Sequence, residues 1–290
     1  MRVTRFIGSN VAYIIWFVLY FSIAWIMFGA DLNSFIFVSF IYGISITIAL
    51  CPAGEVILRF LENFRDPSTE QERDYLIPIF EEVYQNAKEV NPNLNSGIQI
   101  YIMDAMYVNA FAIGRRTIAV TKGAMEAFTA DELRGIIAHE LGHLTHGHTK
   151  ALLLSVIGNF YFSVIVWVCR LLFSLAQFAS NISAHFNIIG LFFSLLTFII
   201  RFFVDLSIFL FINLGQIILA LNSRINETQA DSFAYEIGYG RELISGLYLL
   251  QKISMNTDLK LMEKLKASHP HTAYRIAHLE SLEDEIVEAR

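Results

Sequence analysis

Four long apolar stretches constrain the fold of this chain more than any other feature of its sequence. They are Val11–Gly29, Phe35–Leu50, Ala151–Ser180 and Ile188–Leu221. A helix needs about 20 apolar residues to cross the hydrocarbon core of a bilayer. With 55% hydrophobic residues, a mean hydropathy of +0.50 and only 17% charged residues, the composition is typical of an integral membrane protein. We therefore predict a mostly α-helical membrane protein with about four transmembrane helices, paired as two hairpins.

The distribution of basic residues predicts how the chain is oriented. Arg2 and Arg5 precede the first stretch. Arg59 and Arg65 follow the second, whereas the short loop between the two stretches has no basic residue. The positive-inside rule therefore places the N-terminus and the chain after Pro52 in the cytoplasm. The first stretch is too long for the apolar part of a signal peptide, and another apolar stretch follows at once.

Between the predicted hairpins the chain contains the sequence HELGH, which begins at His139 and has the H-E-x-x-H pattern. On a helix, residues four apart share a face, so His139 and His143 can direct two imidazole nitrogens at one ion. A helix is indicated because Thr129 can cap its first turn and Glu132 completes a capping box. In metalloproteases the motif binds zinc, and its glutamate, here Glu140, acts as general base. Five letters also match by chance, so a third ligand is required.

A catalytic zinc site has three protein ligands and one open position. The metzincin pattern would place the third ligand at position 149, which is Thr149, so that class is excluded. His146 and His148 follow the motif closely. However, a ligand two turns further along the same helix seldom fits one ion, so we expect a capping or supporting role for His146.

A carboxylate on a later helix is the alternative third ligand. Glu227 is the best candidate, because Asp231 lies four residues later on the same helical face. Asp231 can then accept a hydrogen bond from the outer nitrogen of a ligand histidine. Glu227 must also lie on the same side of the membrane as His139, which requires an even number of crossings between them. We therefore predict that Ile188–Leu221 is one long helix.

Three charged residues lie inside the second predicted hairpin. Charges at membrane depth are costly and usually pair with one another. Arg201 and Asp205 are four residues apart and can pair, and Arg170 on the neighbouring stretch is a second possible partner for Asp205.

The remaining sequence predicts a small sheet and further helices. Ile98–Ile102, Val108–Ile113 and Thr117–Val120 have the patterns of strands, so we predict a small antiparallel sheet before the H-E-x-x-H helix. Ser68–Ala87 is predicted to be helical, with a kink or break at Pro78.

These features divide the chain into four segments. Residues 1–52 are an N-terminal transmembrane hairpin, and residues 53–150 are a catalytic domain with the small sheet and the H-E-x-x-H helix. Residues 151–222 are a second transmembrane hairpin, and residues 223–290 are a helical part of the catalytic domain that carries the third zinc ligand.

Four sequence patterns, together with the two hydrophobic hairpins, resemble those of HtpX-type membrane zinc endopeptidases. They are NAFAIG at Asn109–Gly114, HELGH at His139–His143, SRxxExxAD at Ser223–Asp231 and HP…RI at His269–Ile276. The resemblance covers almost the whole chain and is far more specific than H-E-x-x-H alone. One departure is that the family usually has HPP or a similar sequence where this chain has His269-Pro270-His271.

The resemblance implies a gluzincin-like α+β catalytic domain. It implies one zinc ion per chain, held by His139, His143 and Glu227, with Glu140 as catalytic base. It also implies a multi-pass protein of the bacterial inner membrane whose catalytic domain faces the cytoplasm. The implied role is stress-related quality control, in which damaged or misassembled membrane proteins are cleaved.

Two sets of residues are candidates for contact with the substrate. An edge strand before the metal helix can pair with an extended peptide through its backbone. The candidates for this strand are Asn109, Ala110, Phe111 and Ala112. Hydrolysis also needs a donor to the oxyanion besides zinc. His269 and Arg275 are candidates for this donor, and the alternative for Arg275 is an ion pair with Asp231.

Charge and cysteine content exclude other classes of partner. The net charge of −6 argues against nucleic acid, so the expected partners are the lipid bilayer and membrane-protein or peptide substrates. Cys51 and Cys169 lie in apolar runs, far from any metal-ligand spacing, so neither a disulfide nor a cysteine zinc site is predicted.

Three other functions share part of this pattern. A prenyl-protein-type endopeptidase would cut near a lipidated C-terminus, but that type has more than four spans. A non-catalytic zinc-binding membrane signalling protein would share the ligands, but an intact Glu140 argues against it. A transporter could use Arg201 and Asp205 as an ion path, but it would not need His139 and His143.

Overall fold

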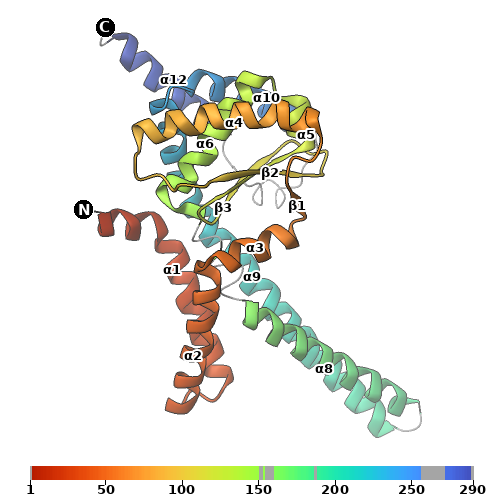
Figure 1. The fold of residues 1–290 in the computed structure, drawn as a ribbon. Coiled ribbons are helices and arrows are strands. Elements are labelled where there is room, and N and C mark those ends of the chain that lie inside the picture. The colour runs from red at the N-terminus through yellow and green to blue at the C-terminus, as the bar shows by residue number, and fades with distance from the viewer. Residues whose placement is uncertain (1, 150–152, 154–159, 186–187, 256–271, 289–290) are drawn as a thin grey trace. The chain divides into compact units, whose positions relative to one another are not determined.

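The computed structural model describes the chain except for residues 1, 150–152, 154–159, 186–187, 256–271 and 289–290 (Figure 1). The chain divides into two compact units. The first contains Met1–Val11, Ile46–Ile157 and Ala220–Arg290, and the second contains Ala12–Ser45 and Gly158–Leu219. The H-E-x-x-H helix and the segment that begins at Ala220 therefore belong to one unit, although the chain between them passes through the other.

The apolar stretches form helices. They are α1 (Arg2–Met27), α2 (Leu32–Leu50), α8 (Phe160–Ala184) and α9 (Ile188–Glu236). Among the described residues, Leu32–Leu50 and Ile188–Leu206 are long and apolar enough to cross a membrane, and Ile14–Met27 is a shorter apolar helix. Only 6% of the Ile188–Leu206 window is buried, unlike the core helix of a soluble protein. Two helices thus meet the criterion for a span, and the total of four crossings stays a prediction.

The second hairpin contains an ion-pair cluster. α9 is a single helix of 49 residues, which confirms the prediction of one long helix. Arg170 of α8 donates from Nε to Asp205 Oδ1 at 3.0 Å, and Arg201 Nε lies 3.6 Å from Asp205 Oδ2. Both predicted partners of Asp205 are confirmed. The pairing reduces the cost of placing these charges among apolar side chains.

The sheet of the first unit has four strands in the order β1-β2-β4-β3 (Figure 1). The strands are β1 (Phe64–Arg65), β2 (Gln99–Met103), β3 (Ala110–Ile113) and β4 (Thr117–Thr121). β1 pairs antiparallel with β2, and β3 pairs antiparallel with β4, but β2 and β4 are parallel. The prediction of a purely antiparallel sheet is therefore wrong. β3 and β4 form a hairpin whose second strand, not its first, lies beside β2, so β4 runs in the same direction as β2.

Helices cover one face of this sheet. α4 (Glu70–Val90) and α6 (Ala130–His146) pack together over it, and α10 (Gly240–Met255) packs against α6 and α12 (Thr272–Glu288) (Figure 1). The core between them is aliphatic, and each fully buried leucine or isoleucine contributes about 1.5–3 kcal/mol. Its most deeply buried side chains are Leu76, Ile102, Ile118, Leu133, Ile137, Leu141, Leu243, Leu247 and Leu279. The H-E-x-x-H helix α6 is thus at the centre of the unit.

α4 continues past Pro78, so a break at that position is not found. A proline inside a helix removes one hydrogen bond and costs about 3 kcal/mol. Burial of Leu76, Ile79 and Val83 on either side of it offsets this cost. The predicted helix is therefore held by its packing.

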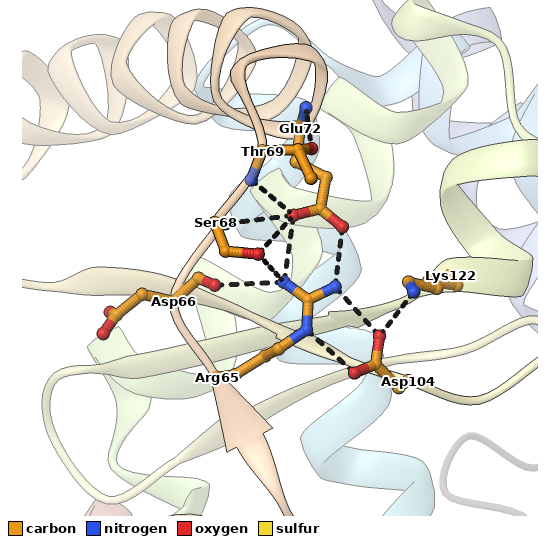
Figure 2. A network of polar contacts seen from close by, with 7 residues as sticks. All are labelled: Arg65, Asp66, Ser68, Thr69, Glu72, Asp104 and Lys122. Carbon is orange, nitrogen blue, oxygen red and sulfur yellow. Dashed lines mark hydrogen bonds and ion pairs between the residues drawn. The ribbon is translucent and has the colours of Figure 1, made fainter.

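A polar network joins β1 to the start of α4 and to the short helix α5 (Lys122–Ala127), as Figure 2 shows. Arg65 contacts Glu72 at 2.6 Å through Nη2 and Asp104 at 2.8 Å through Nε. Lys122 Nζ lies 2.8 Å from the other oxygen of Asp104. Glu72 also forms a capping box with Thr69 at the first turn of α4. The Arg65 guanidinium therefore connects β1 to α4 and to Asp104, the residue directly after β2.

The buried carboxylate of Glu55 joins α3 (Pro52–Leu61) to the β3–β4 turn. It accepts hydrogen bonds from the Arg115 backbone N at 2.6 Å and from Thr117 Oγ1 at 3.3 Å. The turn residue Gly114 has φ +62°, and a Cβ there would overlap the Glu55 side chain. Only glycine fits this position without strain. The contact holds the end of the edge strand β3.

Candidate metal centre

The H-E-x-x-H motif lies on α6, as predicted. The Thr129 side chain accepts a hydrogen bond from Glu132 N, and the Glu132 side chain accepts one from Thr129 N, which confirms the capping box. Gly147, with φ 76°, ends the helix. His139, Glu140 and all residues between Ile136 and Leu144 are buried, so both histidines are presented inside the unit.

Helix α9 packs directly on the motif. A Cβ on Gly142 would lie 2.8 Å from Ala230 Cα and 2.9 Å from Ala230 O, distances that real Cβ atoms do not adopt. Glycine between the two histidines therefore allows close contact between the backbones of α6 and α9. This contact brings Glu227, one turn before Ala230, to the two imidazoles.

His139, His143 and Glu227 form a cluster of three potential ligands, all buried, whose ligand atoms lie within 4.8 Å of one another. The two Nε2 atoms are 3.0 Å apart, and each lies 3.4 Å from an oxygen of Glu227. Ligands about 2.0–2.1 Å from a tetrahedral zinc ion are about 3.3 Å from each other. The three residues therefore fit a zinc ion with almost no rearrangement.

Asp231 and Arg275 support the outer side of the cluster. His139 Nδ1 lies 2.8 Å from Asp231 Oδ1, so the proton sits on Nδ1 and the Nε2 lone pair faces the cluster. Arg275 donates to both oxygens of Asp231, at 2.6 and 2.9 Å, and its Nη1 lies 3.0 Å from Glu227 Oε2. Burial raises the pKa of Asp231, but Arg275 and His139 outweigh burial and lower this pKa to about 2. The predicted Asp231 contact and Arg275–Asp231 pairing are both present.

The pKa values of the two motif histidines move in opposite directions. Burial and Arg275 lower the pKa of His139, but Asp231 and Glu227 outweigh them and raise it. For His143 burial dominates and lowers the pKa, against the opposing charges of Glu227 and Glu140. The charge of Glu140 therefore acts at the same site, and a neutral His143 offers the lone pair that a metal ion requires.

His148 and Gln229 are contacts of this site that the sequence did not predict. His143 Nδ1 lies 3.0 Å from Nδ1 of the buried His148, and His148 Nε2 lies 3.0 Å from Gln229 Oε1. Burial, followed by the effect of His143, lowers the pKa of His148 to about 3. No spacing rule connects positions 148 and 229. Only the position of Gln229 between the two predicted carboxylates of α9 could have pointed to it.

The other predicted residues have different positions. Asn109 directly precedes β3, which contains Ala110, Phe111 and Ala112 and lies at the edge of the described sheet. Ala110 and Ala112 are buried, and Phe111 is half-buried. The edge position is confirmed, and peptide binding there stays a prediction.

Of the later histidines, His146 lies outside the cluster of described ligand candidates, and its Nδ1 is 2.8 Å from the carbonyl oxygen of Gly142. This contact agrees with the supporting role expected for His146. His269 lies outside the described residues, so its proposed contact with an oxyanion has no structural test here.

The sequence profile of peptidase family M48 matches residues 70–283. The chain therefore belongs to peptidase family M48, and its apolar helices and metal-competent cluster are those of a membrane metalloprotease. Protease HtpX of Pasteurella multocida is 25% identical over 305 residues, which cover 98% of this chain and 99% of that protein. A Protease HtpX homolog of Methylacidiphilum infernorum is 25% identical over 308 residues, 95% of this chain and 97% of its own. The HtpX-type resemblance is thus confirmed over nearly the whole chain.

The crystal structure of S. mikatae Ste24p aligns with 96% of this chain and 65% of its own, at 21% identity. The TM-score of 0.45 is too low to establish a common fold.

Proposed function

We propose that this protein is a zinc-dependent endopeptidase of the bacterial inner membrane that cleaves damaged or misassembled membrane proteins at the cytoplasmic face. The observation that carries the proposal is the buried cluster of His139, His143 and Glu227, with ligand atoms 3.0 to 3.4 Å apart. Two imidazoles and one carboxylate are a ligand set of catalytic zinc sites, in which a fourth position stays open.

The residues of the site have separate roles in this proposal. His139, His143 and Glu227 hold one zinc ion, and Asp231 orients His139. A zinc ion held there supplies Lewis acidity, which polarises a peptide carbonyl and makes water acidic enough to lose a proton near neutral pH. Glu140, only 2% exposed, accepts the proton of the attacking water and returns it to the leaving amine.

The position of β3 at the edge of the sheet favours an unfolded, extended substrate. A peptide that adds a strand to β3 is held by backbone hydrogen bonds, which do not depend on its sequence. Such binding suits an enzyme that acts on damaged proteins of many sequences. The substrates are proteins of the same bilayer. The positive-inside pattern of four arginines supports a cytoplasmic site, to which the chain returns after each of two hairpins; they are Arg2, Arg5, Arg59 and Arg65.

Substitution of Glu140 tests the activity. Full-length Glu140→Gln protein in detergent should keep one zinc ion per chain and lose about 10²- to 10⁴-fold in kcat on a denatured membrane protein, because general-base catalysis is removed. Glu236→Gln, on an exposed position of α9, is the matched control and should cleave like the unchanged protein.

Full turnover by Glu140→Gln would remove this residue from the mechanism. A zinc-loaded unchanged protein without any cleavage would favour the non-catalytic zinc-binding function instead. The inactive variant also serves as a substrate trap: retained unfolded membrane segments support the proposed substrate class, whereas retained lipidated C-terminal peptides would contradict it.

A further inference from the structure

His143 contacts the buried His148, which in turn contacts the half-buried Gln229, and the proposed reaction uses neither side chain. His148 Nδ1 lies 3.0 Å from His143 Nδ1, and His148 Nε2 lies 3.0 Å from Gln229 Oε1. His148 is only 5% exposed, so its contact with His143 is shielded from water. The two side chains come from different parts of the chain, since His148 follows α6 and Gln229 lies on α9.

The hydrogen-bond directions in this chain of contacts are determined by its two ends. His143 can offer the Nε2 lone pair to a metal ion only if its proton is on Nδ1. His148 Nδ1 must then accept that proton in a hydrogen bond, so the proton of neutral His148 is on Nε2. That N–H needs an acceptor, and Gln229 Oε1 is the atom within reach. In this arrangement each of the two hydrogen bonds, His143 to His148 and His148 to Gln229, has one donor and one acceptor.

The opposite arrangement is unfavourable. If Gln229 offered its NH₂ group, His148 would have to carry its proton on Nδ1, opposite the Nδ1 proton of His143. Two buried N–H donors would then face each other at 3.0 Å, and neither would have an acceptor, which is unfavourable. The amide orientation of Gln229 therefore selects the tautomer of both histidines.

We propose that His148 and Gln229 are positioning residues that hold His143 in its metal-binding tautomer, as Asp231 does for His139. The inference rests on the proposed function, because it assumes that His143 binds the ion through Nε2. It assigns a role to Gln229, which lies between Glu227 and Asp231, so that this short segment of α9 orients both histidines. Contacts of this kind are worth about 10- to 100-fold in metal affinity at zinc sites.

The test is the zinc dissociation constant of full-length protein in detergent, measured by competition with a chromophoric chelator. His148→Leu and Gln229→Leu should weaken zinc binding by about 10- to 100-fold. His148→Asn keeps an acceptor oxygen near the Nδ1 position, and Gln229→Glu keeps an acceptor for His148. Both variants should therefore retain most of the zinc affinity that the leucine variants lose. Glu236→Gln, at an exposed position of α9 outside the cluster, should bind zinc like the unchanged protein.

Two further readouts separate positioning from a structural role. Cobalt(II) bound in place of zinc should show an altered ligand-field spectrum in the leucine variants and a near-normal one in the asparagine and glutamate variants. The melting temperatures of the metal-free proteins should be similar for His148→Leu and His148→Asn, and likewise for Gln229→Leu and Gln229→Glu. Equal zinc affinity in all variants, or equal losses in each leucine and acceptor pair, would overturn the inference while leaving the zinc site in place. Absence of zinc binding by the unchanged protein would overturn the proposed function as well.

Discussion

Gly142 determines how closely the helices that carry the ligands approach each other. An alanine Cβ at this position would lie 2.8 and 2.9 Å from backbone atoms of Ala230, so α9 would have to move away from α6. Overpacking costs about 1–3 kcal/mol, and the better helix propensity of alanine returns about 1. Gly142→Ala should therefore lower the free energy of unfolding by up to about 2 kcal/mol, with weaker zinc binding because Glu227 moves with α9.

Gly246 provides the control for this prediction. It also lies in a helix, α10, but an added Cβ would make only ordinary contacts, at 3.4 Å with the Ile136 side chain and at 3.6 Å with Glu132 O. Gly246→Ala should be neutral or slightly stabilising and should leave zinc affinity unchanged. Thermal unfolding and chelator titration of the two variants side by side provide the measurement. Equal behaviour of both variants would show that the close approach at Gly142 does not position Glu227.

Residue-level prediction from sequence succeeded where a spacing rule applied. His139 and His143 are four residues apart on one helix, as are Glu227 and Asp231 on another. The structure brings all four together. The contact of His148 with Gln229 has no such rule, because the two positions are 81 residues apart and meet only through packing of α6 against α9. Glycine is needed at position 142 because Ala230 of α9 lies so close to it. Its neighbour Ala230 is visible only in three dimensions.

At the scale of elements, the ion-pair network around Arg65 predicts acid sensitivity. Hydrogen bonding to Arg65 and to Lys122 lowers the pKa of Asp104 to about 2, and hydrogen bonding to Arg65 holds the pKa of Glu72 well below its usual range. Carboxylates with a lowered folded-state pKa stabilise the fold above their unfolded pKa, near 4, and this contribution is lost as pH falls towards 2. We expect the melting temperature of the metal-free protein to fall across this window.

The comparison is Arg65→Leu, which removes the shared cation. Its melting temperature should be lower at pH 6 and should depend less on pH between 4 and 2, because the carboxylates then titrate closer to their ordinary pKa. Added salt should reduce the difference, since the Asp104 side chain is half-exposed. Glu89→Gln, at an exposed position of α4, the helix that carries Glu72, is the control. An identical pH profile for Arg65→Leu would show that the network does not contribute to stability.

Element-level prediction succeeded for helices and strands with clear periodicity and failed for their arrangement. All three predicted strands exist, but the parallel β2–β4 pair was missed, because strand order depends on which strand of the β3–β4 hairpin lies beside β2. The two-residue strand β1 is too short to give an alternating pattern. The break at Pro78 was not found because the aliphatic core holds α4 on both sides of it.

At the scale of the whole molecule, the metal centre requires a defined membrane topology. The metal centre combines residues from both sides of the second hairpin, so the chain must return to the compartment it left. The positive-inside pattern and the continuous helix α9 predict that Asn33, in the first turn of α2, and His185, just after α8, face away from the cytoplasm. Asn93, in the first unit, should face the cytoplasm.

Single cysteines test this topology. Cys51 and Cys169 are first replaced by alanine, and cysteine is then introduced in place of Asn33, His185 or Asn93. A membrane-impermeant maleimide should label the first two only from outside intact cells and the third only in inverted membrane vesicles. Labelling of Asn33→Cys and Asn93→Cys from the same side would contradict two crossings in the first hairpin.

The binding of one metal ion by two imidazoles and the carboxylate of α9 is tested most directly by the zinc content of purified full-length protein. We compare the unchanged chain with Glu227→Gln and with Glu236→Gln, an exposed position on the same helix. The prediction is one zinc per chain for the unchanged protein and for Glu236→Gln, and little or none for Glu227→Gln after dialysis. Retention of a full zinc ion by Glu227→Gln would contradict the assignment of the third ligand and, with it, the proposed metal centre.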